Sequence, residues 1–481
     1  MPFTFEDELA ELSRWRLLPR FHDLSLFEQM ASMEFLPPER QRELQWEKLR
    51  TVLQFVEGNV PFYKELFKKS GIRSQDFRGP DDLTAMPMLS RESVQARGDD
   101  LQAVRLPQGH SHLGVYHSSG STGQPVSILG TNRSNQMFSL LRCRECRWAR
   151  ADLRGSLAAI RPKRDLPLNK EGEQLKEGET WVGKSWRYVG SYFYTGPSLG
   201  FGHSNPLPEQ VAWLEKHQPT YLLAQSADLE HLALAFQDRA PLKNLRGLHA
   251  ISQDVTPEMR RRIEQIFGAP LFQNYGLNEI GMVAVHCNEG ERYHVHGEHC
   301  MVEIVDDQGQ ACRPGEIGHI LVTGFTNMAM PLVRYDTGDM ATAVSGSCSC
   351  GRTLPSFGPV KGRYRRIAFL PPGTWDYWMA FQVTLEDMPQ ALAAPLRQYQ
   401  LHQFKDGGFE LRIVADGALP PEFDAFIQAR WHGTKAGETP PLRIITVDHL
   451  ARPPGGKFQN FSSDFTPYPG AENTLEGQDE T

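Results

Sequence analysis

The feature that most constrains the fold is an alternation of short apolar runs with helical patterns in the middle of the chain. Within residues 219–240 the run PTYLLAQ precedes the helical stretch SADLEHLALAFQDRA, and within 245–268 the run LRGLHAIS precedes TPEMRRRIEQIFG. In the second helix Thr256 is a suitable N-cap, and Pro257 suits the first helical position. Strands that alternate with helices are typical of an α/β fold, which we therefore predict.

The regions on either side of this alternation have other patterns. Residues 6–70 predict helices, and residues 300–345 predict two or three strands joined by turns. From about residue 361, QYQLHQFKDGGFELRIVAD predicts a hairpin and PEFDAFIQARWHG predicts a helix. With 481 residues the chain exceeds one compact core, because domains run to roughly 100–200 residues. We predict a large domain of mixed sheets flanked by helices, a small α+β domain and a disordered acidic tail, over 1–360, 361–466 and 467–481 respectively.

The bulk composition excludes several classes of partner. The chain has 51 basic and 58 acidic residues, a net charge of −7, which gives no drive toward nucleic acid or an anionic membrane. It has no apolar run of about 18 residues, and its first residues lack the pattern of a signal peptide. Seven cysteines do not suggest a disulfide framework. We expect a cytoplasmic monomer or homodimer that binds neither nucleic acid nor membrane.

A loop of hydroxyls and glycines, HSSGSTGQP (117–125), raises the question of function. Successive amides in such a loop can cradle a phosphate, although a solvated surface loop has the same composition. A second stretch, GETWVGKS (178–185), matches a phosphate-binding motif letter for letter. The residues before it, LNKEGEQLKE, cannot form the buried strand that this motif requires. We therefore interpret Lys184 as a residue of a loop or strand edge.

One helical stretch, LLRCRECRWARADLR, contains a C-x-x-C pair. Cys143 and Cys146 lie in mid-helix, whereas redox chemistry favours a helix N-terminus, so we predict two semi-buried thiols. Arg147, Arg150 and Arg154 share one face of the predicted helix. We interpret that face as solvated, because no other basic surplus supports a nucleic-acid site.

Four further stretches carry residues with definite chemistry. They are NYGLNEIG, PLVRYDTGDM, VKGRYRRI and RPPGGKFQNF, which contain Glu279, Asp339, Arg363 and Lys457 in that order. Each alone could be an exposed turn, a helix cap or a surface lysine. Together with HSSGSTGQP, in this order and over residues 45–465, the sequence resembles the adenylate-forming ligases, and in particular their phenylacetate–CoA ligase branch.

The resemblance rests on several motifs in register. SSGSTGQP resembles the phosphate loop S-S-G-T-T-G-K-P, YGLNE resembles Y-G-x-[ST]-E, and YDTGD resembles Y-x-T-G-D. CSCGRTLP followed by GR is typical of the branch, and GGK corresponds to the loop of the catalytic lysine. Such enzymes activate a carboxylate with ATP and Mg²⁺ to an acyl-adenylate. They then pass the acyl group to a thiol, commonly coenzyme A, while the small C-terminal domain rotates between the two steps.

The resemblance also implies roles for single residues. The phosphates of ATP would lie on the loop residues Ser118, Ser119, Gly120, Ser121, Thr122 and Gly123. Tyr275 would stack on adenine between Asn274 and Gly276, Asp339 would accept from the ribose hydroxyls, and Arg363 would lie beside it. Glu279 would ligate Mg²⁺, and Lys457 would bridge the carboxylate and the α-phosphate. The acyl pocket would include Tyr194, Ser252 and Gln253, and we expect an aromatic or heteroaromatic acid.

The sequence departs from the family pattern at several positions. Gln124 replaces the usual lysine of the phosphate loop, and Asn278 replaces the Ser or Thr before Glu279. GRYRRIAFLPPGTW departs from the hinge motif and from the strand that follows it, so the second half-reaction is less constrained than the first. An amine or a carrier-protein thiol could replace coenzyme A. A nucleotide-binding protein without catalysis is the alternative outside the enzymes.

A structural zinc site is a separate prediction from the residues themselves. Thiolates and one imidazole in a tetrahedral array bind zinc, although unliganded thiols are the alternative. The candidate ligands are Cys287, His294, Cys348 and Cys350. His296 and His299 are rivals of His294 for the fourth position.

Overall fold

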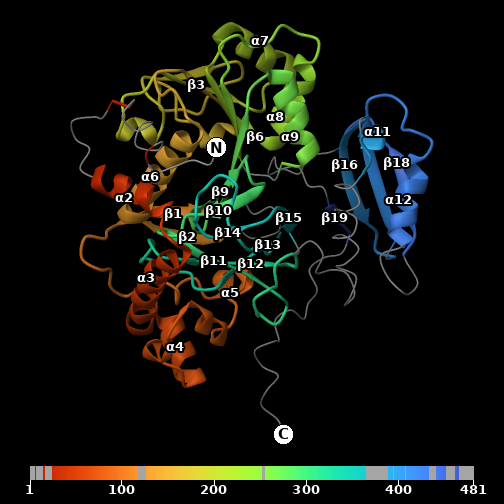
Figure 1. Cartoon of the computed structure of the whole chain (residues 1–481). Coiled ribbons are helices and arrows are strands. Elements are labelled where there is room, and N and C mark those ends of the chain that lie inside the picture. The colour runs from red at the N-terminus through yellow and green to blue at the C-terminus, as the bar shows by residue number, and fades with distance from the viewer. Residues whose placement is uncertain are drawn as a thin grey trace. The chain divides into compact units, whose positions relative to one another are not determined.

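The structure is a computed structural model, and the ribbon confirms the α/β fold (Figure 1). It describes residues 6, 15–16, 24–117, 126–251, 255–363, 388–393, 395–406, 408–432, 440–450 and 461–464. The chain forms two compact units, of which the first runs to Val360 and the second consists mainly of the residues after it. The predicted tail of residues 467–481 lies outside the described residues.

A nine-stranded mixed sheet forms the centre of the first unit. Its strand order is β14-β10-β9-β8-β7-β6-β3-β5-β4. Strands β5, β3, β6, β7 and β8 pair in parallel, and the strands at both edges pair antiparallel. The bounds are β3 (Leu157–Arg161), β4 (Thr180–Gly183), β5 (Ser198–Gly202), β6 (Tyr221–Gln225), β7 (Gly247–Ile251), β8 (Leu271–Leu277), β9 (Gly281–Cys287), β10 (Arg292–Val295) and β14 (Ser356–Phe357).

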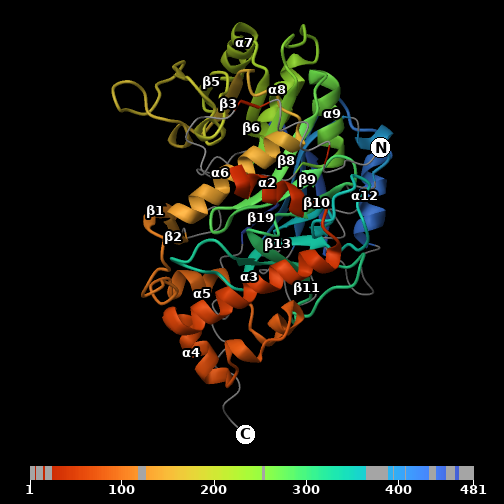
Figure 2. The ribbon, with the colours of Figure 1, turned by 60° about the vertical axis from the view of Figure 1, so that its left-hand side comes forward.

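Helices cover both faces of the parallel part of this sheet. Side chains alternate along a strand, so Leu222 and Ala224 of β6 join one apolar cluster and Tyr221 joins another. The first cluster packs under α7 (Leu207–His217), α8 (Ser226–Phe236) and α9 (Pro257–Phe267). The second packs under α2 (Leu24–Met33) and α6 (Asn132–Trp148), which lie close together in Figure 2. The predicted cap of α9 is confirmed, because Thr256 Oγ1 accepts from Met259 N at 3.2 Å.

A second sheet of four strands, in the order β11-β12-β13-β15, packs against the N-terminal helices. Leu49 and Leu53 share one core with Ile320 and Val322. This confirms helices within residues 6–70 and strands within 300–345. The elements are α3 (Pro38–Asn59), α4 (Pro61–Ser70), η1 (Ser74–Asp76), η2 (Pro80–Ala85), α5 (Arg91–Ala96), β11 (Cys300–Val305), β12 (Ile317–Gly324), β13 (Tyr335–Thr342) and β15 (Val360–Arg363). The hairpin β1 (His112–His117) and β2 (Ser127–Thr131) and the short turns η3 (Lys163–Asp165) and η4 (Val189–Ser191) complete the unit.

The second unit is a small α+β domain. Its four-stranded sheet has the order β18-β17-β16-β19, and β16 and β17 form the predicted antiparallel hairpin. Phe423 and Trp431 of the predicted helix pack with Leu411 and Ile413 of the hairpin. The bounds are α11 (Gln390–Ala393), β16 (Leu396–Gln403), β17 (Phe409–Ala415), α12 (Phe423–His432), β18 (Leu442–Thr446) and β19 (Phe461–Ser463).

The interpretation of the arginines after the C-x-x-C pair is wrong. Helix α6 ends at Trp148, and Arg150 lies beyond it in a left-handed conformation (φ 49°), so the three residues do not share a helical face. Arg147 is buried because its guanidinium is paired with the carboxylate of Glu34. Cys143 and Cys146 are thiols of mid-helix, as predicted, but they are fully buried rather than semi-buried.

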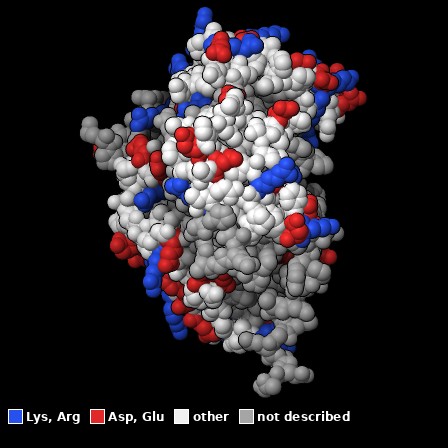
Figure 3. Space-filling model, turned by 90° about the vertical axis from the view of Figure 1, so that its right-hand side faces the viewer, with Lys and Arg blue, Asp and Glu red and all other residues white. Residues whose placement is uncertain are grey.

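The remaining surface features agree with the composition. Lys184 follows the edge strand β4 and no helix begins there, as expected for a chance match to the phosphate motif. On the face shown in Figure 3, acidic and basic side chains of the described residues are interspersed. None of the described helices has the length and apolar character needed to cross a membrane.

Candidate functional site

The end of β8 and the turn that leads to β9 carry four of the predicted site residues. Asn274, Tyr275 and Gly276 lie at the end of β8, and Glu279 lies in the turn that leads to β9. A Cβ atom at Gly276 would lie only 3.1 Å from the carbonyl oxygen of Gly281, so the two strands approach closely here. Gly281 itself has a φ of 101°, which L side chains rarely adopt. The glycines therefore allow the sharp turn that presents Glu279.

Tyr275 is braced by two other aromatic rings. The edges of Tyr293 and Phe357 lie at centroid distances of 6.4 Å and 5.8 Å from it, and those two rings stack on each other at 5.3 Å. Edge-to-face packing of this kind favours one orientation of the ring. Tyr275 remains half-buried, so part of the ring is available to a planar ligand.

Glu279 is a buried carboxylate with two donors. Arg91 Nη1 lies 2.9 Å from Oε1, and the Tyr335 hydroxyl donates to the same oxygen at 3.2 Å. Glu279 is 8% exposed, and a buried charge of this kind requires such partners. Because both donors reach Oε1, a cation could bind Oε2 without displacing either of them.

Neither donor was identified from the sequence, although Tyr335 opens the YDTGD motif. The two are held together by the backbone of Leu89, whose N–H donates to Arg334 O at 2.9 Å and whose carbonyl accepts from Asp336 N at 3.0 Å. Arg91 then begins α5, and Ser90 caps this helix by accepting from Ser93 N. The contacts of Leu89 with the start of β13 thus bring Arg91 to Glu279.

His299 fixes the turn that follows Glu279. Its Nε2 lies 3.0 Å from the carbonyl oxygen of Ile280, and its Nδ1 lies 2.8 Å from the hydroxyl of Thr326. Burial lowers the pKa of His299 to about 4, so the ring is neutral at pH 7. A neutral ring with its proton on Nε2 donates to Ile280 and accepts from Thr326, which satisfies both contacts.

Asn274 has a partner on the neighbouring helix. Its Nδ2 donates to Glu145 Oε1 of α6 at 3.0 Å, and Arg142 pairs with the other oxygen of that carboxylate. Burial opposes the charge of Glu145, but Arg142, His249 and Asn274 outweigh it and lower the pKa of this carboxyl to about 2. The side chain of Asn274 thereby anchors the strand that carries Tyr275 to α6.

Of the other residues predicted for the nucleotide and acyl sites, two are described with their side chains. Asp339 is buried within β13, and Tyr194 is exposed, with the guanidinium of Arg16 4.7 Å from the centre of its ring. Arg363 ends β15, but its side chain is not described. The predicted residues outside the described part of the chain are Ser118, Ser119, Gly120, Ser121, Thr122, Gly123, Ser252, Gln253 and Lys457.

The four predicted zinc ligands meet at one point of the first unit. Cys287 ends β9, His294 lies in β10, and Cys348 and Cys350 lie in the loop before β14, which pairs with β10. Their ligand atoms all lie within 4.8 Å of one another. His294, rather than His296 or His299, is the histidine of this cluster. A Cβ atom at Gly290 would lie 2.2 Å from Cys348 Sγ, so the β9–β10 turn requires a glycine there.

The distances in the cluster fit a tetrahedral ion. A zinc ion about 2.3 Å from each sulfur places two sulfurs about 3.8 Å apart. The sulfurs of Cys348 and Cys287 are 3.7 Å apart, and Cys350 Sγ lies 3.3 Å from His294 Nε2. A hydrogen bond from Cys287 lowers the pKa of Cys350 to about 3, against the effect of burial. Burial opposes the charge of His294, but hydrogen bonds with Cys348 and Cys350 raise its pKa to about 9.

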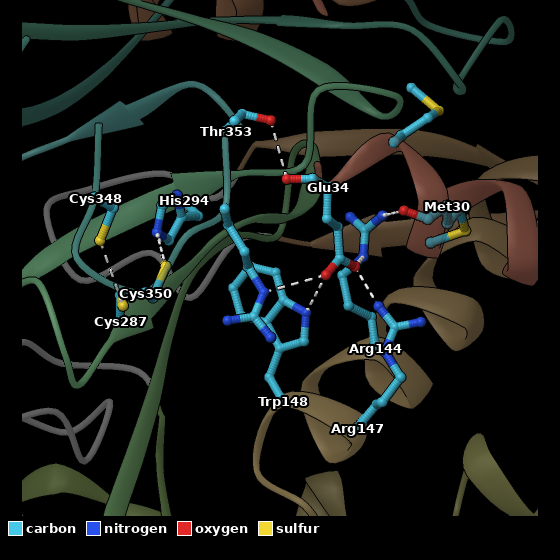
Figure 4. A network of polar contacts seen from close by, with 12 residues as sticks. Met30, Glu34, Arg144, Arg147, Trp148, Cys287, His294, Cys348, Cys350 and Thr353 are labelled. Carbon is cyan, nitrogen blue, oxygen red and sulfur yellow. Dashed lines mark hydrogen bonds and ion pairs between the residues drawn. The ribbon is translucent and has the colours of Figure 1, made fainter. Parts of the chain in front are cut away.

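A network of buried polar side chains adjoins the cluster (Figure 4). The ring of Trp148 meets that of His294 edge-on, with centroids 5.8 Å apart. The indole N–H of Trp148 donates to Glu34 Oε2 at 2.8 Å, and Arg352 Nε donates to the same oxygen at 3.2 Å. The cluster is therefore linked through these side chains to Glu34, the first residue after α2.

Comparisons of the sequence with known proteins agree with the resemblance. A family model described as AMP-binding enzyme matches residues 186–330. A phenylacetate-coenzyme A ligase of Thermus thermophilus is 27% identical over 339 residues, which cover 69% of this chain and 72% of the relative. A phenylacetate-coenzyme A ligase of Pseudomonas putida is 24% identical over 388 residues, which cover 79% and 82%.

Solved structures show the same fold. A 2-hydroxyisobutyryl-CoA ligase in the postadenylation state matches with a TM-score of 0.67 at 16% identity, over 90% of this chain and 91% of that chain. An anthranilate CoA ligase in complex with anthranoyl-AMP matches with a TM-score of 0.52 at 16% identity, over 72% and 65%. At these identities the likeness concerns the fold alone.

Proposed function

Because the chain belongs to the adenylate-forming ligase superfamily, in its phenylacetate–CoA ligase branch, we propose that it is an AMP-forming acid–CoA ligase. Its substrate is an aromatic or heteroaromatic carboxylic acid. An aromatic acid agrees with the curated relatives, whose names specify phenylacetate.

The proposed reaction has two balanced steps. In the first, a carboxylate oxygen attacks the α-phosphorus of ATP, the bond from this phosphorus to pyrophosphate breaks, and pyrophosphate leaves with the electron pair. In the second, the thiol of coenzyme A loses its proton and attacks the acyl carbon, and AMP leaves. The first step brings together two negatively charged groups, so it requires cationic groups placed in advance.

In this proposal three parts of the machinery lie among the described residues. Tyr275 offers a braced aromatic face to adenine, and Asp339 offers a carboxylate to the ribose hydroxyls. Glu279 would hold Mg²⁺ through Oε2. Mg²⁺ in such a site neutralises charge on the phosphates and orients them.

The remaining assignments are those that the resemblance to the ligases implies. The hydroxyls and amides of residues 118–123 bind the β- and γ-phosphates. Lys457, on the small domain, bridges the carboxylate and the α-phosphate, with Arg363 beside Asp339. Ser252 and Gln253 contribute to the acyl pocket with Tyr194. Rotation of the small domain exchanges the surface that faces the site between the two steps.

The observation that carries the proposal is the geometry of Glu279. Its carboxylate is buried directly after the strand of Tyr275, where Arg91 and Tyr335 fix one oxygen at 2.9 Å and 3.2 Å. A surface glutamate would need no such support. We interpret the arrangement as support for a carboxylate whose second oxygen can bind a cation.

A screen for acid-dependent pyrophosphate exchange tests the proposal. The purified chain is incubated with MgATP, labelled pyrophosphate and one aryl acid at a time. We expect label to enter ATP only with a suitable acid, and acyl-CoA to form when coenzyme A is added. If exchange occurs but no acyl-CoA forms, and the acyl group is instead transferred to an amine or a carrier protein, then that molecule rather than coenzyme A is the acyl acceptor. A protein that binds ATP and exchanges nothing with any acid would not be a ligase.

We also propose that Cys287, His294, Cys348 and Cys350 bind a structural zinc ion. Three sulfurs and one nitrogen fill the four positions of a tetrahedral site, so no position remains for a substrate. None of the seven cysteines, all of which the structure describes, forms a disulfide.

Metal analysis tests the zinc proposal. Protein purified without chelators should contain about one zinc per chain, as expected for a single four-ligand site. The variant Cys350→Ser should lose the ion, whereas Cys312→Ser, at a half-buried cysteine outside the cluster, should keep it. Absence of zinc from the wild-type protein would contradict the assignment.

A further inference from the structure

We infer that the metal cluster fastens the N-terminal segment of residues 24–36, named here the N-terminal arm, to the rest of the first unit. The inference rests on the proposed zinc site and adds a role to it. The link between them is the stretch from Cys348 to Thr353, which holds two of the ligands and ends in two residues that bind Glu34.

The contacts of this stretch with the arm are specific. Arg352, two residues after Cys350, donates to Glu34 Oε2 at 3.2 Å, and Thr353 N donates to Glu34 O at 2.8 Å. The guanidinium of Arg352 also lies 4.2 Å from the centre of the Trp148 ring, whose edge contacts His294. A metal that fixes His294 and Cys350 therefore also fixes Trp148 and Arg352, the two side chains that donate to Glu34 Oε2.

Glu34 is the point at which the arm is held by charge. Its side chain is fully buried. Its Oε1 forms an ion pair with Arg144, whose Nε lies 2.9 Å away, and accepts a hydrogen bond from Arg147. Hydrogen bonds to a buried charged group are stronger than neutral ones, and the loss of one partner leaves the rest of the network incompletely satisfied. Displacement of Arg352 therefore weakens the attachment of Glu34 to α6.

The arm covers apolar surface close to the candidate active site. Phe27 and Met30 of α2 are buried in one cluster with Phe193 and Met282, and the rings of Phe27 and Phe193 lie 5.9 Å apart. Met282 is the third residue after Glu279. Release of the arm would expose this cluster to water next to the β8–β9 turn.

Among the described residues, hydrogen bonds also hold the loop of the two cysteines, and Arg292 Nη1 donates to Gly346 O just before it at 3.1 Å. Gly351 N donates to Cys348 O at 3.1 Å, and Ser349 Oγ donates to Glu289 O at 2.7 Å at an exposed position. Such bonds are weak compared with metal–thiolate bonds, whose binding energy appears as folding energy. Without the ion, the three sulfurs and the imidazole lie close together with no metal to bind them. The metal would therefore add to the contacts with Glu34 and Trp148 that position Arg352.

Hydrogen exchange measured by mass spectrometry on the full chain tests the inference. Four samples are compared: the zinc-containing protein, the same protein treated with dipicolinate, Arg352→Ala, and the control Arg292→Ala. Arg292 donates to Gly346 O at 3.1 Å, near the same loop, and it has no contact with Glu34 among the described residues. Zinc content is measured on every sample.

We expect the amides of residues 24–36 to exchange about tenfold faster after chelation and in Arg352→Ala, the order expected for the loss of a charge-assisted hydrogen bond. Arg352→Ala should keep its zinc, so that the effect of the lost arginine is distinguished from the effect of metal loss. The exchange rates of peptides from α8 should be the same in all samples. Loss of zinc without faster exchange of the arm would overturn the inference. A wild-type protein that contains no zinc would instead overturn the zinc proposal itself.

Discussion

Replacement of Arg91 by glutamine tests the support of the candidate magnesium ligand. The side chains of Arg91 and Glu279 are 11% and 7% exposed, and loss of one partner of a buried ion pair costs about 3–5 kcal/mol. The Tyr335 hydroxyl still donates to Glu279, and a bond to a charged group contributes about 1.5–3 kcal/mol. Because Glu279 keeps this donor, its charge is not left uncompensated, and we expect Arg91→Gln to lower the free energy of unfolding by about 3 kcal/mol, the lower end of that range.

Arg91→Gln should also impair the binding of Mg²⁺. Groups that orient a metal ligand typically affect metal affinity or activity by about 10- to 100-fold. We expect the Mg²⁺ concentration for half-maximal pyrophosphate release to rise at least about tenfold in Arg91→Gln, and less in Arg91→Lys. The assay titrates Mg²⁺ at saturating ATP and acid.

The control is Arg97→Gln, in the same short helical region. Arg97 pairs with Glu65 and Asp100 on a more exposed surface and has no contact with Glu279 among the described residues. It should leave the Mg²⁺ requirement unchanged. An unchanged requirement in Arg91→Gln as well would refute the role given to this ion pair.

Further predictions concern single residues. Tyr335→Phe should raise the Mg²⁺ requirement by roughly tenfold or less, since one hydrogen bond to a charged oxygen is lost; an effect larger than that of Arg91→Gln would reverse the order of the two donors. Lys457→Ala should abolish formation of the acyl-adenylate while ATP binding, measured by calorimetry, is largely kept; unimpaired adenylate formation would contradict its role. The pKa of His299 is about 4 in the folded chain and about 6.5 when unfolded, so the unfolded state binds more protons between these values and stability falls as the pH drops from 6.5 toward 4. His299→Gln should be free of this loss, so its urea midpoint should decline less than that of the wild type; parallel declines would exclude His299 as the cause.

Local patterns predicted much of the fold. The hairpin of β16 and β17, helix α12 and the cap at Thr256 all depend on residues close in sequence, and all are confirmed. The positions of Cys287 and His294 on one hairpin also follow from short spacing. That Cys348 and Cys350 join them is a consequence of the pairing of β10 with β14, which sequence spacing does not contain.

The residues missed by the sequence act over long separations. Arg91 lies 188 positions from Glu279, and Arg352 lies 318 positions from Glu34. An arginine near a glutamate in space has no signature in either local stretch. The error at Arg147 has the same origin, because the carboxylate that buries it comes from 113 positions away. Helical periodicity predicts on which side of a helix a residue lies. Whether that side is buried or exposed to solvent depends on segments that are distant in the sequence.

The transfer of oxygen from the acid to AMP tests the central claim most directly. The chain is incubated with MgATP, coenzyme A and an active aryl acid whose carboxylate is labelled with ¹⁸O, and the products are analysed by mass spectrometry. If an acyl-adenylate forms, one labelled oxygen must appear in the phosphate of AMP, because the carboxylate oxygen stays on phosphorus when the thiol attacks the acyl carbon. Formation of ADP with label in inorganic phosphate, or of AMP without label, would contradict the account.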